Sequence, residues 1–270
     1  MTKAGTIRAG IGGWTFEPWE GTFYPEKLSK AKQLGYAASK LKTIEVNGTY
    51  YSGFTPATYA KWAAETPDRF VFSIKGNRFV TNRKVLSEAG PSMQKFFAQG
   101  LEELGPKLGP LVWQFANTKK FEIGDFEGFL NLLPRQHAGL PLRHVVEVRH
   151  PSFVVPEFAA LCRKHKVAIC HADHAAYPEI ADVTADFVYS RLQKGNDAIP
   201  TAYDQVDLEK WSRIAREWAE GKEPDGLVYA DPVTTADEVS RDVFVYFIHE
   251  GKVNAPQGAM AFQGLVDVAS

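Results

Sequence analysis

The feature that most constrains this chain is a regular alternation of short apolar runs with longer amphipathic segments. Eight runs have the length and the β-branched or aromatic content of buried strands: Thr6–Gly12, Thr43–Val46, Phe70–Ile74, Leu111–Phe115, the apolar start of Val145–Phe153, Val167–His171, Phe187–Leu192 and Val243–Ile248. Alternating strands and helices form parallel βαβ units, and eight strands close a barrel. The sequence therefore predicts an α/β fold, a single TIM-type (β/α)8 barrel domain over residues 1–270.

The helices of this barrel are expected where apolar residues recur at helical spacing and where Pro or Gly marks the ends. These segments are Pro25–Leu41, Thr55 or Pro56 to Glu65, Pro91–Leu108, Phe121–Leu133, Ser152 or Val155 to His165, Asp204–Gly221 and Asn254–Val268. One segment, Gly226–Asp242, does not fit the alternation. It could hold a short extra strand and helix, and we interpret it as an insertion before the last strand.

Composition excludes some classes of protein. A hydrophobic content of 44% and an aromatic content of 13% are typical of a globular protein with a sizeable core. The formal net charge of -1 argues against bulk electrostatic binding to nucleic acid. The first residues lack the apolar core of a signal peptide, and no apolar run is long enough to span a bilayer. We therefore expect a cytoplasmic protein without a membrane partner, with Cys162 and Cys170 as buried thiols.

Polar residues recur where the predicted strands end. A TIM-type barrel carries its site at the carboxyl ends of the strands, which gathers one set of candidates: Glu45, Asn47, Lys75, Gln114, Glu147, Arg149, Asp173, Arg191 and His249. Because a strand has a period of two, Glu147 and Arg149 lie on the same side. Buried charges are costly unless they pair or serve a function. The set therefore predicts either an active site or a ring of structural ion pairs.

The first functional hypothesis is an enzyme without a metal, either a hydrolase or an isomerase. Acid–base catalysis would come from buried carboxylates and a neighbouring Arg, whose environment shifts their pKa values; these candidates are Glu45, Glu147, Arg149 and Asp173. A small polar, sugar-like or phosphorylated ligand would be held by cations, amides and aromatic rings, with Trp14, Asn47, Tyr50, Lys75, Arg78, Gln114, Arg191 and His249 as candidates.

Two further hypotheses remain open. A metal-dependent phosphodiesterase, nuclease-like enzyme or isomerase would need converging ligands, drawn from Glu45, His150, His171, Asp173, His174 and His249. Their spacing matches no recognised metal motif, so we assign no metal ligand and identify no cofactor.

The basic loop with Arg78, Arg83 and Lys84 could contact a nucleic-acid backbone. A barrel that binds a ligand without chemistry is the third hypothesis.

Several motifs resemble a known family. The runs IGGWTFEPWEGTFYP, TIEVNGTYY, FVFSIKGNRFVTN, LVWQF, EVRHPSF, VYSRL and VYFI…APQGAMAF follow one another along nearly the whole chain. Together they resemble the YecE-like family, the domain of unknown function numbered seventy-two. The resemblance implies a TIM-type barrel and the location of its site, but no reaction. The chain departs from the family pattern after Arg191 and at Phe247–His249, so ligand contacts at these two strand ends are not carried over.

Overall fold

The structure is a computed structural model that describes residues 5–268. Eight parallel strands close into a barrel in the order β1-β10-β9-β8-β7-β4-β3-β2. Their bounds are Ile7–Gly12 (β1), Thr43–Val46 (β2), Val71–Lys75 (β3), Leu108–Gln114 (β4), His144–Glu147 (β7), Ala168–Asp173 (β8), Phe187–Lys194 (β9) and Asp242–Glu250 (β10). Each strand pairs with its neighbours in the chain order, and β10 closes the ring against β1. The predicted TIM-type (β/α)8 barrel is confirmed.

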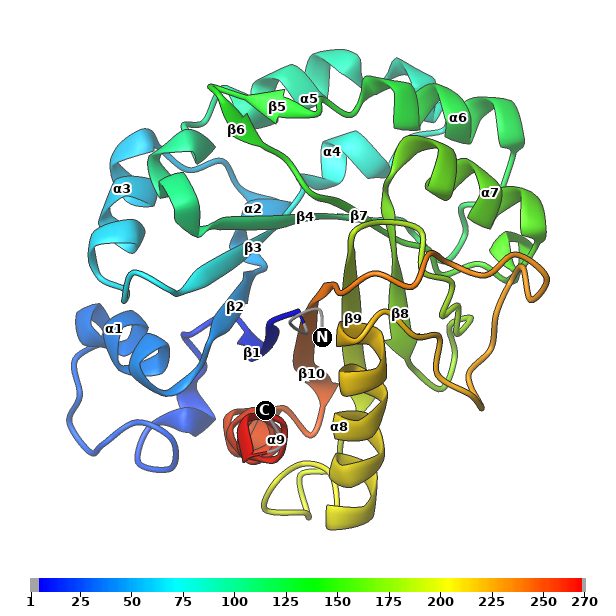
Figure 1. The fold of residues 1–270 in the computed structure, drawn as a ribbon. Coiled ribbons are helices and arrows are strands. Elements are labelled where there is room, and N and C mark those ends of the chain that lie inside the picture. Colours follow the sequence, from blue (N-terminus) through cyan, green and yellow to red (C-terminus); the bar gives the residue numbers. More distant parts are fainter. Residues whose placement is uncertain (1–4, 269–270) are drawn as a thin grey trace.

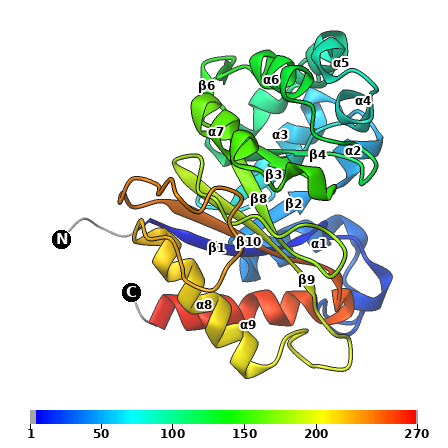
Figure 2. The same ribbon diagram turned by 90° about the vertical axis from the view of Figure 1, so that its right-hand side faces the viewer.

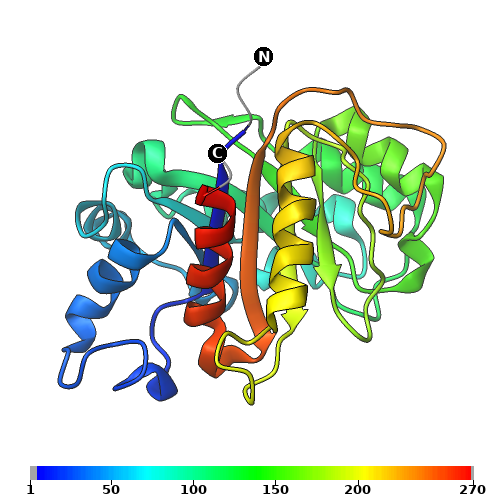
Figure 3. The same ribbon diagram turned by 60° about the horizontal axis from the view of Figure 1, so that its bottom comes forward.

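Helices surround the strands (Figure 1). They are α1 (Lys30–Lys40), α2 (Gly48–Tyr51), α3 (Pro56–Ala64), α4 (Arg78–Thr81), α5 (Gly90–Phe97), α6 (Ile123–Leu132), α7 (Pro156–His165), α8 (Gln205–Ala219) and α9 (Ala255–Val268). Short 3-10 turns and a two-stranded hairpin of β5 (Gln136–His137) and β6 (Leu140–Pro141) complete the elements. The helices α8 and α9 lie side by side outside β10 and β1, far from α5 and α6 (Figures 2 and 3).

The barrel interior is filled in layers, as expected when inward side chains alternate along each strand. At the amino ends Phe187 and Phe244 meet edge to face, with ring centroids 6.2 Å apart. The next layer holds Tyr189 and Tyr246, and the hydroxyl of Tyr246 lies 2.7 Å from that of Thr43. The layer above, at the carboxyl ends, is charged. The larger apolar core lies between the strands and the helices.

Two predicted helices differ from the structure at their ends. The helix expected at 25–41 begins only at Lys30, because Lys27 has a left-handed backbone with a φ of 64°. The helix expected at 91–108 stops at Phe97. Gly100 follows with a φ of 90°, and a 3-10 segment interrupted by a non-helical Gly105 leads into β4. Glycines with a left-handed backbone commonly end helices. Gly100 therefore indicated an earlier helix end, but the apolar periodicity continued past it.

The insertion before the last strand contains no helix or strand in residues 226–241. Hydrogen bonds from its backbone fix its position instead. The Asp182 carboxylate accepts from the N–H groups of Ala230 and Asp231 at 2.6 and 3.0 Å. Arg163 adds an ion pair with Asp231 at 2.7 Å. A strand and helix here, which the sequence left open, are therefore absent from this segment. No helix among residues 5–268 is long and apolar enough to cross a membrane.

Candidate functional site

Two buried carboxylates flank one buried guanidinium at the carboxyl end of the barrel. Glu45 is the penultimate residue of β2, Glu147 ends β7 and Arg191 lies on β9. The Nη2 atom of Arg191 lies 3.0 Å from Oε1 of Glu45, and its Nη1 lies 2.5 Å from Oε2 of Glu147. Both carboxylates are fully buried. The closed barrel therefore brings together three charges that lie far apart in the sequence: Arg191 is 146 residues from Glu45 and 44 residues from Glu147.

A second guanidinium and a tyrosine hydroxyl complete the bonding of these carboxylates, and Gln114 accepts from that guanidinium. Arg149 donates from Nε and Nη2 to Oε1 of Glu147 at 3.1 and 2.9 Å. Its Nη2 also donates to Oε1 of Gln114 at 2.7 Å. On the other side, the Tyr189 hydroxyl donates to Oε2 of Glu45 at 2.6 Å. All four carboxylate oxygens are thus hydrogen-bonded, which is the condition for holding such charges in a core.

These contacts fix the charge of Glu147. Burial opposes its ionisation, yet the guanidinium groups of Arg191 and Arg149 and the nearby Lys75 lower its pKa to about 2. Burial likewise opposes the charge of Arg191, but Glu147 and Glu45 raise its pKa above the usual range. At neutral pH neither side chain exchanges a proton readily, because general acid–base catalysis needs a pKa near the working pH. Both therefore act as fixed charges.

Lys75 differs from the other buried charged residues at the carboxyl end of the barrel because it lacks an ion-pair partner among the described residues. It ends β3, its side chain is 7% exposed, and no carboxylate in the described part of the chain forms an ion pair with it. The Nζ atom donates to Oδ1 of Asn47 at 3.2 Å and lies 4.9 Å from the ring centroid of Tyr50. Burial, helped by the positive charge of Arg191, lowers its pKa to about 8, although Glu45 opposes the shift. We name the set Glu45, Lys75, Glu147, Arg149 and Arg191 the charged network.

Asp173 lies outside this network. In the ladder between β8 and β9 its neighbour Ala172 pairs with Arg191, so Ala172 shares the inward side and Asp173 points outward. The Asp173 carboxylate lies 2.7 Å from Nζ of Lys194 and 3.5 Å from the hydroxyl of Tyr203. The structure therefore places this predicted catalytic residue in a separate pair at the outer side of the barrel.

Three predicted ligand-binding residues also lie away from the charged network. Trp14 packs edge to face on Trp62 of α3, with ring centroids 5.1 Å apart. Arg78 is exposed and lies over the rings of the aromatic residues beside it. His249 is exposed, has a φ of 75°, and meets His174 edge to face at 5.1 Å. Asn47, Tyr50, Lys75, Gln114 and Arg191 are the predicted binding residues that the barrel brings together.

The histidines proposed as metal ligands do not converge on one point, although the rings of His174 and His249 are in contact. His150 Nδ1 lies 2.8 Å from the Ser152 hydroxyl. His171 points outward, between the Ser190 hydroxyl at 2.9 Å and the Glu179 carboxylate at 3.1 Å. Within residues 5–268 no three His, Cys, Asp or Glu side chains are grouped so that they could hold a metal ion.

In the basic loop after β3, the side chain of Arg83 forms hydrogen bonds within the protein. Arg83 donates to the carbonyl oxygens of Phe79 and Glu88 at 2.8 and 3.1 Å and to the Ser92 hydroxyl at 2.9 Å. These bonds brace the loop against α5. Of the three basic residues singled out in this loop, Arg83 thus has a structural role that leaves fewer donors for a phosphate backbone.

Sequence reasoning missed two tyrosines of the site. Tyr189 is two residues before Arg191 on β9, so the period of two already places both on one side of the strand. That signal was available in the sequence. Tyr177 lies in the connection between β8 and β9, and its ring centroid is 4.5 Å from the Arg149 guanidinium. No local pattern marks Tyr177, because its position depends on how the connection crosses the barrel mouth.

The chain matches several known proteins along its length. A family model described as "Protein of unknown function DUF72", the YecE-like family expected from the motifs, matches residues 8–270. The UPF0759 protein YunF of Bacillus subtilis (strain 168) is 24% identical over 160 residues, which are 56% of this chain and 54% of that protein. The chain thus aligns with about half the length of this relative.

Solved structures with the same architecture include two DUF72 family proteins. The one from Thermotoga maritima superposes with a TM-score of 0.71 at 20% identity, and the alignment covers 97% of this chain and 99% of that one. The one from Enterococcus faecalis V583 has a TM-score of 0.68 at 16% identity, covering 97% and 96%. At these identities the likeness supports the barrel fold alone.

Proposed function

The chain belongs to the DUF72 family, and from the geometry at the carboxyl end of its barrel we propose that it is an enzyme acting on a small polar ligand that carries a phosphate or carboxylate group. The observation that carries the proposal is Lys75, a buried amine that lies beside three ion pairs and has no carboxylate partner of its own. In this proposal Lys75 moves the proton, and the remaining members of the charged network position it and the ligand.

Charge balance supports an anionic ligand. The charged network contains two carboxylates and three cations, so one positive charge is left without a partner. That charge is on Lys75, since Arg149 and Arg191 are both bonded to carboxylates. A phosphate or carboxylate next to Nζ would complete the pairing, and charge-assisted hydrogen bonds of this kind are about twice as strong as neutral ones. Asn47 and Gln114 would bond the ligand's neutral polar groups.

The proton-transfer role follows from the pKa values. Glu147, with a pKa of about 2, stays ionised at neutral pH, whereas Lys75, with a pKa of about 8, changes charge close to it. A group with a pKa near the working pH is the most effective acid–base catalyst. We therefore transfer the catalytic role that the sequence suggested for Glu147 to Lys75. Glu45, Glu147 and Arg191 then form a rigid charged platform.

The experiment is a turnover screen on paired compounds, with products identified by mass spectrometry. Sugar phosphates and hydroxy acids would be tested beside the matching neutral sugars and esters. The proposal expects turnover only with anionic members, and loss of a general acid or base should lower the rate of Lys75→Met by about a hundredfold or more. Lys95→Met, at an exposed position on α5, is the matched control and should retain the wild-type rate.

Two results would overturn the proposal. One is equal turnover of neutral and anionic members of a pair, since this would remove the need for the unpaired charge. The other is an unchanged rate in Lys75→Met with a substrate that wild-type protein converts. Circular dichroism of both variants would establish that they share the wild-type fold.

A further inference from the structure

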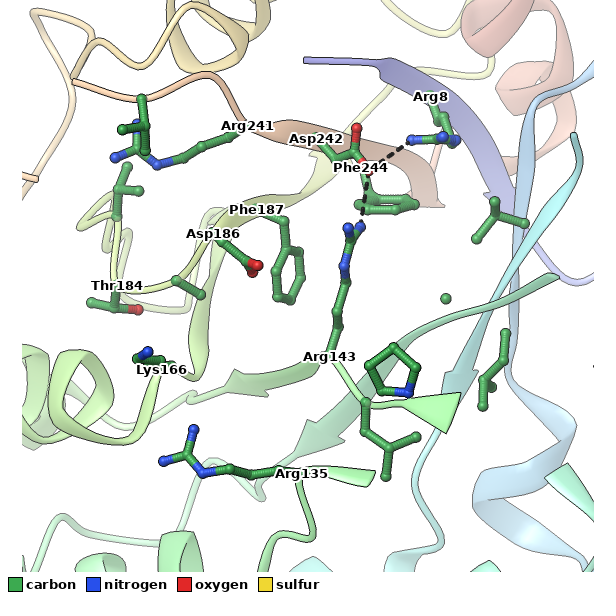
Figure 4. A pocket seen from close by; sticks show the side chains of 18 of the residues that line it. Arg8, Arg135, Arg143, Lys166, Thr184, Asp186, Phe187, Arg241, Asp242 and Phe244 are labelled. Atoms are coloured by element: carbon green, nitrogen blue, oxygen red, sulfur yellow. Dashed lines mark hydrogen bonds and ion pairs between the residues drawn. The ribbon is translucent and has the colours of Figure 1, made fainter. Parts of the chain in front are cut away.

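Figure 4 shows a cavity of about 880 Å³. It lies at the amino ends of the barrel strands, opposite the charged network. Its lining includes the first residues of four strands, Val71, Leu108, Phe187 and Asp242, and Arg143 just before β7. Ligand sites usually enclose about 300–1,000 Å³, so the cavity has the size of a small-molecule site. It is separate from the carboxyl-end site, because the aromatic and tyrosine layers of the barrel interior lie between them.

The cavity is lined by more cations than anions. Arg163 is already bonded to the carboxylates of Asp182 and Asp231. The other basic residues of the lining are Arg8, Arg135, Arg143, Lys166 and Arg241, and the acidic ones are Asp186, Asp237 and Asp242. These five cations exceed the three carboxylates by two positive charges. Arg135 and Lys166 are exposed and form no ion pair within the described chain.

The hydrogen bonding of Arg241 independently supports a ligand site here. Its residue is 3% exposed, and it lines the cavity wall next to the barrel rim. Its Nη2 donates to the Asp237 carbonyl oxygen, while Nε and Nη1 have no partner among residues 5–268. A buried guanidinium with two unused donors is costly unless an acceptor approaches it. Figure 4 shows Arg241, Lys166 and Arg135 around the same side of the cavity as Asp186.

The floor of the cavity is aromatic, and ion pairs hold the two arginines that lie over it. Arg8 and Arg143 share Oδ2 of Asp242 at 3.4 and 3.0 Å. Their guanidinium carbons lie 5.4 and 5.5 Å from the ring centroids of Phe244 and Phe187. These contacts fix the two arginines over an aromatic floor. The cavity thus combines an apolar base with an excess of fixed guanidinium donors.

We propose that this amino-terminal cavity is a second ligand site, which binds a small organic anion with an apolar body and a phosphate or carboxylate group. The insertion of residues 226–241 then has a role, since Asp237, Val239 and Arg241 form one wall of the site. The site is a binding site rather than a second active site, because the charged network with Lys75 lies at the other end.

Binding of phenyl phosphate to the protein tests the proposal. Inorganic phosphate, which has only the anionic group, and phenol, which has only the apolar ring, serve as comparison probes. Titrations followed by NMR would give the Kd for each probe. Phenyl phosphate is expected to bind more tightly than either fragment. Because a charged hydrogen bond contributes about 1.5–3 kcal/mol, Arg143→Gln and the exposed Arg135→Ala should each raise its Kd by about tenfold. Arg213→Ala, which removes a surface cation paired with Glu217, should leave it unchanged.

Two further readouts separate the sites. Saturation with phenyl phosphate should slow backbone hydrogen exchange in residues 231–241, and Lys75→Met should still bind this probe. The proposal is overturned if no probe binds, if the Kd for phenyl phosphate in both cavity variants equals that of the wild-type protein, or if Lys75→Met abolishes binding. Arg135→Ala is the safeguard against misfolding, since this side chain is exposed and makes no ion pair that its removal would break.

Discussion

Replacing Glu147 by Gln would test how the charged network is held. The Glu147 carboxylate accepts from Arg149 through Oε1 and from Arg191 through Oε2. A Gln side chain keeps the shape but has a single acceptor, and its NH2 group would face one of the two guanidinium groups. One guanidinium would therefore lose its hydrogen bond to this side chain, and the negative charge that both guanidinium groups share would be removed, while the packing around them would hardly change.

The structure gives the expected size of this effect in two ways. Removing one partner of a buried ion pair destabilises a protein by about 3–5 kcal/mol. Independently, the neighbouring cations hold the pKa of Glu147 at about 2 in the folded state, against an ordinary 4.5. At 1.36 kcal/mol per pKa unit this shift corresponds to about 3 kcal/mol of folding free energy. Because the folded pKa is depressed, this stability is present above pH 4.5 and is lost as the pH falls towards 2.

Urea denaturation of wild-type and Glu147→Gln protein between pH 7 and pH 3 would measure the difference. We expect the variant to be less stable by about 3 kcal/mol from pH 7 to pH 5, and the gap to narrow below pH 4.5. Glu217→Gln, which breaks an exposed pair with Arg213, is the control and should cost less than about 1 kcal/mol. A loss below about 1 kcal/mol, or a gap that stays constant down to pH 3, would refute the reasoning.

Three other predictions concern stability. At pH 7 Lys75→Met should stabilise the fold by up to about 3 kcal/mol in urea, because a folded-state pKa lowered from 10.5 to about 8 opposes folding until the amine is neutral. Burial lowers the pKa of His144 to about 4 from 6.5, so wild-type protein should lose up to about 3 kcal/mol as the pH falls from 6.5 to 4, and His144→Asn should flatten that slope. A Cβ at Gly100 would lie 2.6 Å from Pro56 at a φ of +90°, so Gly100→Ala should lower the thermal midpoint by an amount equivalent to more than about 1 kcal/mol, whereas Gly264→Ala should not.

The fold was predictable because parallel strands buried on both faces are continuous apolar runs. All eight runs became barrel strands, with ends shifted by a few residues. The helix ends were less predictable, since a backbone with positive φ interrupts a helix without disturbing the apolar spacing. Lys27 delays the start of α1 in this way, and Gly100 follows the end of α5. The segment of residues 226–241 had no apolar periodicity to interpret. It is held by hydrogen bonds to Asp182 and not by secondary structure.

The site was predictable only in part, for a geometric reason. Glu45, Glu147 and Arg191 follow from two rules, that strand ends meet at one rim and that alternate residues point inward. Asp173 shows the limit of the first rule, because its place at a strand end was clear but its outward direction depends on the register with β9. Charge pairing was out of reach from sequence, so the unpaired state of Lys75 emerged only from the structure.

The proposed function depends most directly on Lys75 being a buried amine without a counter-ion, available for proton transfer. Its pKa can be measured directly by NMR titration of the side-chain amine in isotope-labelled protein, with Lys75→Met used to assign the signal. We expect a pKa of about 8. A pKa close to the ordinary 10.5 would contradict it, since Lys75 would then be a permanently charged member of a structural ion-pair ring.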